Sequence, residues 1–292
     1  MKVALFGKSI SANDAPYLQG FIDRLGSLNF LVYLYEPFYN AISKKITFNQ
    51  EPKTFTTSQE IRGQVEYLFS IGGDGTLLDT VSLVGDSEIP VIGINMGKLG
   101  FLSGISKEEI LPALDKIIGN EYSIDERTLL RLESKEPLFG VLNYALNDFT
   151  VYKSSPNTLL AIKTYVNDEF LNTYWADGLI VATPTGSTAY SLSCTGPILS
   201  PESQNLVITP IASHNLTVRP IVIPDTSVIR IIIESRDLEC YIGLDSRIRK
   251  LVVPMELVIR KEDFRIHLLR MPGRNFFETI RAKLNWGLDI RN

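Results

Sequence analysis

The sequence predicts a two-domain protein in which an α/β domain with a parallel sheet precedes an all-β, sandwich-like domain. In the first part of the chain, short apolar runs alternate with amphipathic runs, which is typical of parallel strands joined by crossover helices. After about residue 120 the pattern changes to closely spaced β-type runs separated by turn residues, which favours an antiparallel sandwich. We therefore expect domains at residues 1–120 and 121–275, with a C-terminal helix and tail, 276–292, packing on the first domain.

Apolar periodicity predicts the individual elements. In the first domain we expect strands at residues 3–6, 30–35, 67–71 and 90–94, and helices at 16–28, 76–84 and 108–118. Thr76 would cap the second of these helices, and the polar segment 43–62 would form a loop or a short helix. In the second part we expect strands at 128–132, 138–152, 159–166, 179–183, 206–208, 228–233 and 251–259, followed by a helix at 276–284.

Composition describes an ordinary globular protein of 292 residues with 45% hydrophobic residues and a formal charge of −4. This charge provides no basic footprint for nucleic acid, so an anionic ligand must be held by local groups. Cys194 and Cys240 have no metal-ligand spacing, and reduced thiols are expected rather than a disulfide. Without a signal-peptide pattern or an apolar run long enough to span a membrane, we expect a cytoplasmic protein with no membrane partner.

The most distinctive motif is Ile71-Gly72-Gly73-Asp74-Gly75-Thr76, which joins an apolar run to a helix-like run. Glycines let a ligand approach the main chain closely, and the free N–H groups at a helix start favour an anion. The motif is neither a Walker A loop nor a Gly-x-Gly-x-x-Gly fingerprint. It predicts a phosphate-bearing ligand beside Asp74, while a tight turn with a solvated aspartate is the alternative.

A second glycine-rich loop, residues 93–102, follows the next predicted strand. In an open parallel sheet both loops would face the same crevice at the carboxyl ends of the strands. Asn95 would hydrogen-bond a ligand there, and Phe101 would form a wall for an aromatic base. Two neighbouring turns with buried apolar tips are the alternative.

Two further polar stretches lie in the β-rich part. Asn147-Asp148 interrupts an apolar run, and its amide and carboxylate suit ribose hydroxyls, although an exposed strand face would also explain it. The segment 176–193 carries Asp177 at the start of a strand and then a run of hydroxyls, small residues and Tyr190. That run would contact a polar ligand and a flat base, unless it is only a capped helix after a turn.

Taken in this order, Gly72-to-Thr76, the 93–102 loop, Asn147-Asp148 and the 177–190 segment with Thr-Gly-Ser-Thr-Ala-Tyr closely resemble the NAD kinase family over most of the chain. The resemblance implies an α/β domain, a β-sandwich domain, and an active site in the crevice between them. It also implies transfer of a phosphoryl group from ATP to NAD, with Mg²⁺ carried on the ATP rather than by a dedicated protein metal motif. Phosphoryl transfer of this kind needs positioning and charge neutralisation more than covalent chemistry.

The same resemblance assigns roles to individual residues. Asp74 would accept the proton of the 2′-hydroxyl on the adenosine ribose of NAD. Asn147 and Asp148 would hold the adenosine region, and Asp177 would orient the dinucleotide. The residue patterns and the resemblance together give the complete set of expected ligand-binding residues: Gly73, Gly75, Thr76, Asn95, Phe101, Asn147, Asp148, Asp177, Thr185, Thr188, Ala189, Tyr190, Ser191, Leu192, Ser193, Ala212 and Arg247.

Two positions depart from the family pattern. The late β segment reads Leu244-Asp245-Ser246-Arg247 where aspartate-glycine-glutamine is common, so Arg247 either replaces an amide contact or points to solvent. Asp148 is one methylene shorter than the usual glutamate. The family resemblance also implies a homo-oligomer. A lipid kinase of the diacylglycerol or sphingosine type and a non-catalytic dinucleotide-binding sensor are the alternative functions.

Overall fold

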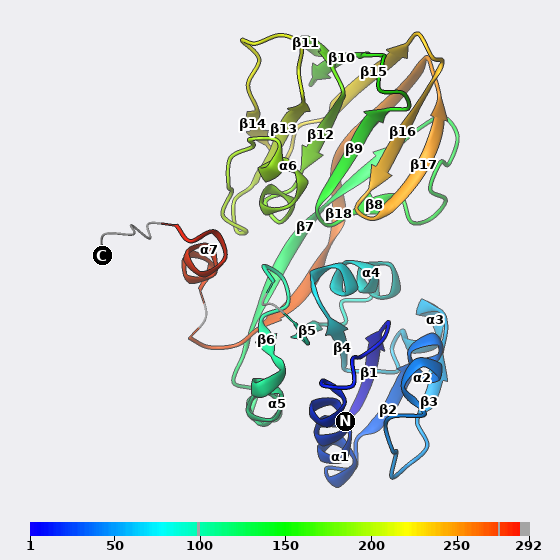
Figure 1. Ribbon diagram of the computed structural model, residues 1–292, viewed down its shortest axis with the longest axis vertical. Coiled ribbons are helices and arrows are strands. Elements are labelled where there is room, and N and C mark those ends of the chain that lie inside the picture. The colour runs from blue at the N-terminus through cyan, green and yellow to red at the C-terminus, as the bar shows by residue number, and fades with distance from the viewer. Residues whose placement is uncertain (98–99, 274, 287–292) are drawn as a thin grey trace. The chain divides into compact units, whose positions relative to one another are not determined.

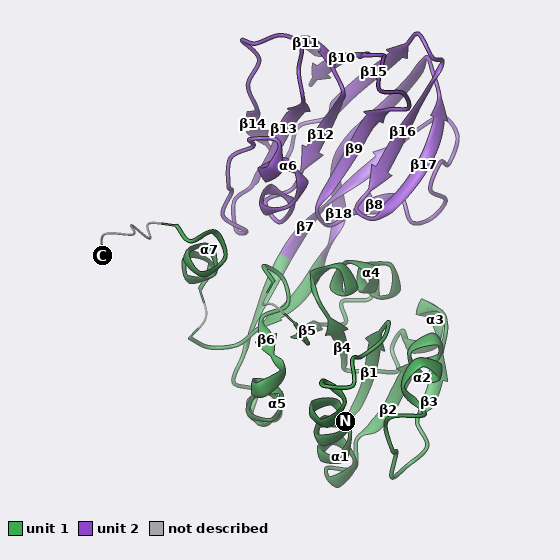
Figure 2. Ribbon diagram, viewed as in Figure 1, with its two compact units in different colours: residues 1–126, 266–292 green, residues 127–265 purple. Residues whose placement is uncertain are grey.

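The computed structural model describes residues 1–97, 100–273 and 275–286 (Figure 1). It divides into two compact units: unit 1 comprises Met1–Glu126 and Ile266–Asn292, and unit 2 comprises Arg127–Arg265 (Figure 2). The sequence placed domain boundaries at 120 and 275, whereas the units divide near 126 and 265. The difference arises because the two long strands that join them, β7 (Ser123–Glu133) and β18 (Met255–Arg270), each contribute residues to both units.

Unit 1 contains a parallel sheet with strand order β3-β2-β1-β4-β5. Its strands are β1 (Lys2–Gly7), β2 (Leu31–Tyr35), β3 (Lys53–Phe55), β4 (Tyr67–Gly72) and β5 (Val91–Asn95). The short β6 (Ile105–Ser106) and Leu268 of β18 also pair with β5. Chain order reverses between β1 and β4, and the carboxyl ends of strands at such a switch point are where open α/β sheets bind ligands.

The longer helices α1 and α5 each bury an apolar face. In α1 (Ala15–Ser27) the buried residues Leu18, Phe21, Ile22 and Leu25 recur at the three- and four-residue spacing of a helical stripe. The other helices are α2 (Glu36–Ile42), α3 (Ser58–Ile61), α4 (Asp74–Val84), α5 (Ile110–Ile118) and α7 (Phe276–Leu284), with a 3-10 turn at Lys107–Glu109. No helix among the described residues is long and apolar enough to cross a membrane.

Unit 1 differs from the sequence-based expectations in three places. Thr76 does not cap α4, because that helix begins two residues earlier at Asp74, with Gly73 in the capping position. The polar segment 43–62 contains a strand, β3, as well as the short helix α3, which begins with a capping box between Thr57 and Glu60. Glu36–Ile42 is helical although no helix was expected there.

Unit 2 is a two-layer antiparallel structure. One sheet has the order β14-β13-β12-β9-β16-β17, and the other contains β11-β10-β15-β18 with β7 and β8 alongside. The strands are β8 (Tyr144–Ala145), β9 (Asp148–Lys153), β10 (Leu160–Val166), β11 (Glu169–Ala176), β12 (Gly178–Ala182), β13 (Asn205–Ile211), β14 (Ile221–Pro224), β15 (Ile229–Ser235), β16 (Glu239–Leu244) and β17 (Arg247–Val252). A 3-10 turn, Gly186–Thr188, and the short helix α6 (Tyr190–Ser193) follow β12.

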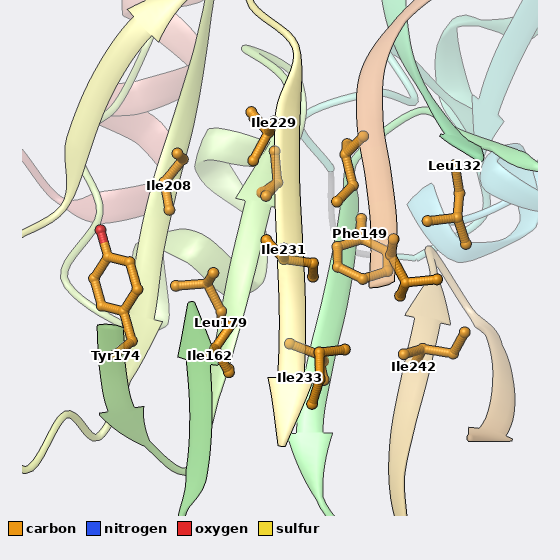
Figure 3. Close-up of a cluster of buried hydrophobic side chains, with 14 of the residues drawn as sticks. Leu132, Phe149, Ile162, Tyr174, Leu179, Ile208, Ile229, Ile231, Ile233 and Ile242 are labelled. Atoms are coloured by element: carbon orange, nitrogen blue, oxygen red, sulfur yellow. The ribbon is translucent and has the colours of Figure 1, made fainter. Parts of the chain in front are cut away.

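The core of unit 2 lies between these two sheets. Inward-facing residues alternate along each strand, as Ile229, Ile231 and Ile233 do on β15 (Figure 3). They pack in one cluster with Phe149 and Ile242 of the other sheet. The predicted fold class, a parallel α/β domain followed by an antiparallel β domain, is therefore confirmed. Two predicted long strands, 138–152 and 251–259, are each interrupted by a turn.

Replacing Phe149 by alanine tests the sandwich core. The ring is fully buried among apolar neighbours of both sheets, so Phe149→Ala should lower the free energy of unfolding by about 3–5 kcal/mol. Urea denaturation measures the loss. Phe170→Ala, which removes an exposed ring from β11, is the control and should cost less than about 1 kcal/mol. Equal losses for the two variants would contradict this placement of the core.

Candidate functional site

The Asp74 turn leaves β4 at the sheet's switch point and opens α4. Its carboxylate accepts hydrogen bonds from three consecutive main-chain amides: Oδ2 from Phe101 N–H at 2.7 Å, and Oδ1 from Leu102 and Ser103 N–H at 3.2 and 2.9 Å. The turn after β4 and the loop after β5 thus meet at one sheet edge, as the sequence predicted. Lys98 and Leu99 of that loop lie outside the described residues.

Two glycines let the loop approach Asp74 so closely. A Cβ on Gly100 would lie 1.8 Å from Asp74 Oδ1, and a Cβ on Gly93 would lie 2.7 Å from Ser103 Cα. Both distances are far below van der Waals contact, so any side chain at these positions would displace the loop or the carboxylate. Gly72 has a similar role, since its Cβ would lie 2.3 Å from Thr76 Oγ1.

Among the described residues, none crowds the two glycines that flank Asp74. A Cβ on Gly73 or Gly75 would meet no atom of the described structure within 4 Å, so a ligand can reach the main chain on both sides of Asp74. An ionised carboxylate has about four acceptor positions; the amides occupy three and leave one on Oδ2. The α4 N-terminus adds an anion-favouring dipole. Lys8, just after β1, pairs with Asp79 of α4 at 2.5 Å.

Asn95 and Phe101 are both present at this edge. Asn95 is buried, and its Oδ1 accepts the Gly97 amide at 2.7 Å, so the side chain shapes the turn after β5. Phe101 is half-buried, and its main-chain amide rather than its ring contacts Asp74. Unit 1 therefore combines an anion-favouring turn with a fixed carboxylate.

In unit 2 the predicted pair Asn147-Asp148 lies where the chain enters β9. The carbonyl side of this segment is held by the turn after β12. Thr183 N–H donates to Asn147 O at 2.9 Å, and Thr183 Oγ1 donates to Leu146 O at 2.6 Å. A Cβ on Gly186 would lie 2.0 Å from Asn147 O, so this glycine allows the two segments to touch.

The amide side of the same segment is held by Asp245, at the turn between β16 and β17. Its Oδ2 accepts Leu146 N–H at 2.8 Å, and its Oδ1 accepts the N–H groups of Asn147 and Asp148 at 2.7 and 3.3 Å. Burial, and secondarily the charge of Asp245, raises the pKa of Asp148 to about 7. Burial also raises the pKa of Asp245, although its three amide donors and Arg247 act in the opposite direction.

Tyr190, Asp177 and Asp148 belong to one electrostatic neighbourhood. Burial raises the pKa of Tyr190, as do the nearby Cys194 thiol and the charges of Asp148 and Asp177. Asp177 pairs with Lys153 of β9 at 2.6 Å. Tyr190 is nearly half exposed, so part of its side chain is accessible to a flat group.

The remaining predicted residues of the 183–193 stretch divide into inward and outward groups. Thr185 is buried and accepts a bond from Arg127 at 3.1 Å, and Ser191 is buried with its hydroxyl 2.9 Å from Thr209 Oγ1. These two hydroxyls support the local fold. The partly exposed or exposed members are Thr188, Ala189, Leu192 and Ser193, and Ala212 at the end of β13 is also exposed.

Arg247 does not point to solvent. Its guanidinium donates to the carbonyl oxygens of Leu142 and Tyr144 and lies 5.8 Å from the centroid of the Tyr144 ring. Sequence reasoning missed Asp245, although it noted the segment that contains it. The available signal was an Asp-Ser dipeptide between two strand-like runs, which is typical of a hairpin turn.

A parallel sheet with a carboxylate-bearing glycine turn at its switch point, in a chain that also forms a β-sandwich, defines a two-unit nucleotide-binding protein. Two family models match this chain, one in each part. The ATP-NAD kinase N-terminal domain matches residues 27–122, and the ATP-NAD kinase C-terminal domain matches residues 146–268.

Individual relatives show the same likeness. The NAD kinases of Cytophaga hutchinsonii and Flavobacterium johnsoniae are 43% and 42% identical to this chain over 100% of both proteins. Yeast NADH kinase complexed with NADH superposes with a TM-score of 0.88 at 27% identity, covering 100% of this chain and 89% of that one. An Archaeoglobus fulgidus NAD kinase in complex with ATP shares the fold, with a TM-score of 0.74 at 22% identity over 98% and 99%. This chain belongs to the NAD kinase family.

The raised pKa of Asp148 predicts a pH-dependent stability. The folded-state pKa of Asp148 lies near 7 rather than near the ordinary value of about 3.9, so the folded protein binds this proton more tightly than the unfolded chain. The resulting contribution to the free energy of unfolding is fully present below about pH 4. It is lost as the pH rises through about 7, by at most about 4 kcal/mol. Asp148→Asn removes this dependence.

Urea denaturation of both proteins between pH 4 and pH 8 measures the effect. The wild-type protein should lose stability relative to Asp148→Asn as the pH rises. A stability difference that stays constant over this range would contradict a raised pKa at Asp148.

Proposed function

We propose that this protein transfers the terminal phosphoryl group of ATP to the 2′-hydroxyl on the adenosine ribose of NAD, producing NADP, with Asp74 as the general base. One observation carries the role of Asp74: three amides fix its carboxylate on an open glycine turn at the switch point of the sheet. A fixed carboxylate next to an anion-favouring helix start is the pairing that hydroxyl phosphorylation requires.

In the proposed step the ribose oxygen attacks the terminal phosphorus of ATP. A new oxygen–phosphorus bond forms, the bond to the bridging oxygen breaks, and ADP leaves with the electrons of that bond. Asp74 takes the proton of the hydroxyl through the acceptor position left on Oδ2. The amides of Phe101, Leu102 and Ser103 keep the carboxylate in place, so the protein contributes mainly by positioning.

The triphosphate needs positive charge, and we propose that Mg²⁺ arrives bound to ATP. Within the part of the chain that the structure describes, no three His, Cys, Asp or Glu side chains gather into a metal-binding group. Mg²⁺ keeps waters and phosphate oxygens as ligands and needs few protein groups. Main-chain amides around Gly73 and Gly75, together with the α4 dipole, support the anion in this proposal.

We propose that the unit 2 residues bind the adenosine part of NAD. Asn147 and Asp148 accept and donate bonds to ribose hydroxyls, and Asp177 orients the dinucleotide. The exposed face of Tyr190, with Thr188, Ala189, Leu192, Ser193 and Ala212, forms the wall for the adenine ring, while Thr185 and Ser191 support that wall from inside. A cytoplasmic homo-oligomer is part of the proposal, and analytical ultracentrifugation tests the assembly.

Removing the proposed base gives the sharpest test. Asp74→Asn keeps the shape of the side chain but cannot take a proton, so kcat should fall by about 10²–10⁴ while the Kd for NAD changes less than threefold. Coupled NADP formation and calorimetry measure the two quantities. Asp115→Asn, an exposed carboxylate of α5, should behave as wild type. Turnover of Asp74→Asn within tenfold of wild type would exclude Asp74 as the base.

A glycine substitution tests the position of the carboxylate without changing its chemistry. The added methyl of Gly100→Ala would lie 1.8 Å from Asp74 Oδ1, so the carboxylate must move, and a shift of about 1 Å costs on the order of 10²-fold in kcat. Gly104→Ala, where the added methyl meets no described atom within 4 Å, is the matched control. Equal kcat values for the two variants would show that the Asp74 geometry is unimportant.

A further inference from the structure

We propose that Asp245 and Arg247, on the turn between β16 and β17, are positioning residues that hold the 142–148 segment in its NAD-binding shape. The identity of the ligand in this inference rests on the proposed function. The hydrogen bonds that carry the inference all lie within unit 2.

Asp245 supplies acceptors where a strand partner ends. β16 pairs with β9 up to Leu244 and Phe149, and the chain then turns away at Asp245. The next three amides toward the N-terminus of β9, those of Leu146, Asn147 and Asp148, all donate to the Asp245 carboxylate instead. Buried amides need acceptors, and a carboxylate can accept all three because it has about four acceptor positions.

The backbone of Asp245 strengthens the same connection. Its N–H donates to Asp148 O at 3.0 Å, and its φ of +53° places it in the left-handed region that aspartate and asparagine tolerate in turns. The side chain therefore leaves the hairpin at the angle that reaches Asn147. One residue contacts the main chain of both proposed ribose-binding residues.

Arg247 holds the other end of the segment. Its planar guanidinium donates to the carbonyl oxygens of both Leu142 and Tyr144 and lies over the Tyr144 ring. Lysine is a compact point donor and cannot reproduce this fork. These contacts of Arg247 are with the protein's own backbone and with the Tyr144 ring.

Holding the 146–148 segment in place should affect the affinity for NAD rather than the rate of phosphoryl transfer. Thr183 and Gly186 fix the carbonyl side of the 146–148 segment, and Asp245 fixes the amide side. A segment held on both sides meets the ligand without further ordering, which improves affinity. Loss of one side should therefore raise the KM for NAD and leave kcat at saturating NAD nearly unchanged.

The principal experiment uses Asp245→Asn. Asparagine tolerates the positive φ but replaces one acceptor oxygen by a donor, so part of the triple contact is lost. We expect the KM for NAD to rise at least tenfold, with kcat within threefold and the KM for ATP within twofold of wild type. Asp168→Asn is the matched control: Asp168 is also in a hairpin turn at φ +65°, and its side chain is 92% exposed.

The pH profile separates positioning from general damage. The ionised Asp148 accepts ribose hydroxyls better than the protonated acid, so the KM for NAD should fall as the pH rises through about 7. Titratable groups in the neighbourhood of Asp148 are Asp245, Tyr190, Cys194 and Asp177, which pairs with Lys153. Asp245→Asn removes one negative charge, which lowers the pKa of Asp148 and moves the midpoint to lower pH. An unmoved midpoint together with an unchanged KM for NAD would overturn the inference.

Hydrogen exchange supplies a readout that needs no ligand. In the free protein, the amides of 146–148 should exchange at least tenfold faster in Asp245→Asn than in wild type, and Asp168→Asn should leave them unchanged. Unchanged exchange in Asp245→Asn would overturn the positioning role. The two proposals can also fail separately. If the wild-type protein neither binds nor phosphorylates NAD, the proposed function is refuted. Faster exchange in Asp245→Asn would still support the positioning role in that case.

Arg247→Lys provides a second variant should Asp245→Asn fail to fold. Lysine keeps the positive charge but cannot donate to both carbonyl oxygens in the geometry of the planar guanidinium. We expect the KM for NAD to rise at least threefold with kcat preserved. Arg249→Lys, two residues along the same strand at an exposed position where the guanidinium bonds to Ile248 O, should match wild type. A KM for NAD that is the same in both lysine variants would show that Arg247 does not position the segment.

Discussion

In both units a single carboxylate accepts hydrogen bonds from three consecutive main-chain amides. Asp74 binds the amides of 101–103 in unit 1, and Asp245 binds those of 146–148 in unit 2. Hydrogen bonds to a charged group contribute about 1.5–3 kcal/mol each, and an unpaired buried amide costs a similar amount. Each carboxylate therefore helps to determine the path of the main chain next to a strand end.

The two carboxylates differ in what they leave free. Asp74 lies between Gly73 and Gly75, where an added Cβ would meet no described atom within 4 Å, and its three amide bonds leave one acceptor position on Oδ2. The Asp245 carboxylate accepts hydrogen bonds from amides of the protein itself. Its charge, together with burial, raises the pKa of Asp148. One carboxylate is suited to taking a proton, and the other to placing the residues that bind.

Local sequence patterns were sufficient for most of the fold. Apolar periodicity predicted the parallel sheet, the α1 and α5 helices and most sandwich strands, because burial of one face imposes a period of 3.6 or 2 on the chain. It failed where the signal was short or polar. The edge strand β3 has three residues, and the polar segment that contains it resembles a loop. The start of α4 was misplaced because Gly73, rather than Thr76, occupies the capping position.

The amino-acid pattern around Gly72–Thr76 and the later motifs was enough to indicate the family and the ATP-dependent phosphorylation of NAD. Those features are local, since each is read from a few adjacent residues. The partners of the two carboxylates are not local: Asp74 meets amides 27 to 29 residues away, and Asp245 meets amides 97 to 99 residues away. Such pairs form only when strand order brings distant turns to one sheet edge, so the role of Gly100, the contact made by Arg247 and the pKa of Asp148 were decided by the tertiary structure.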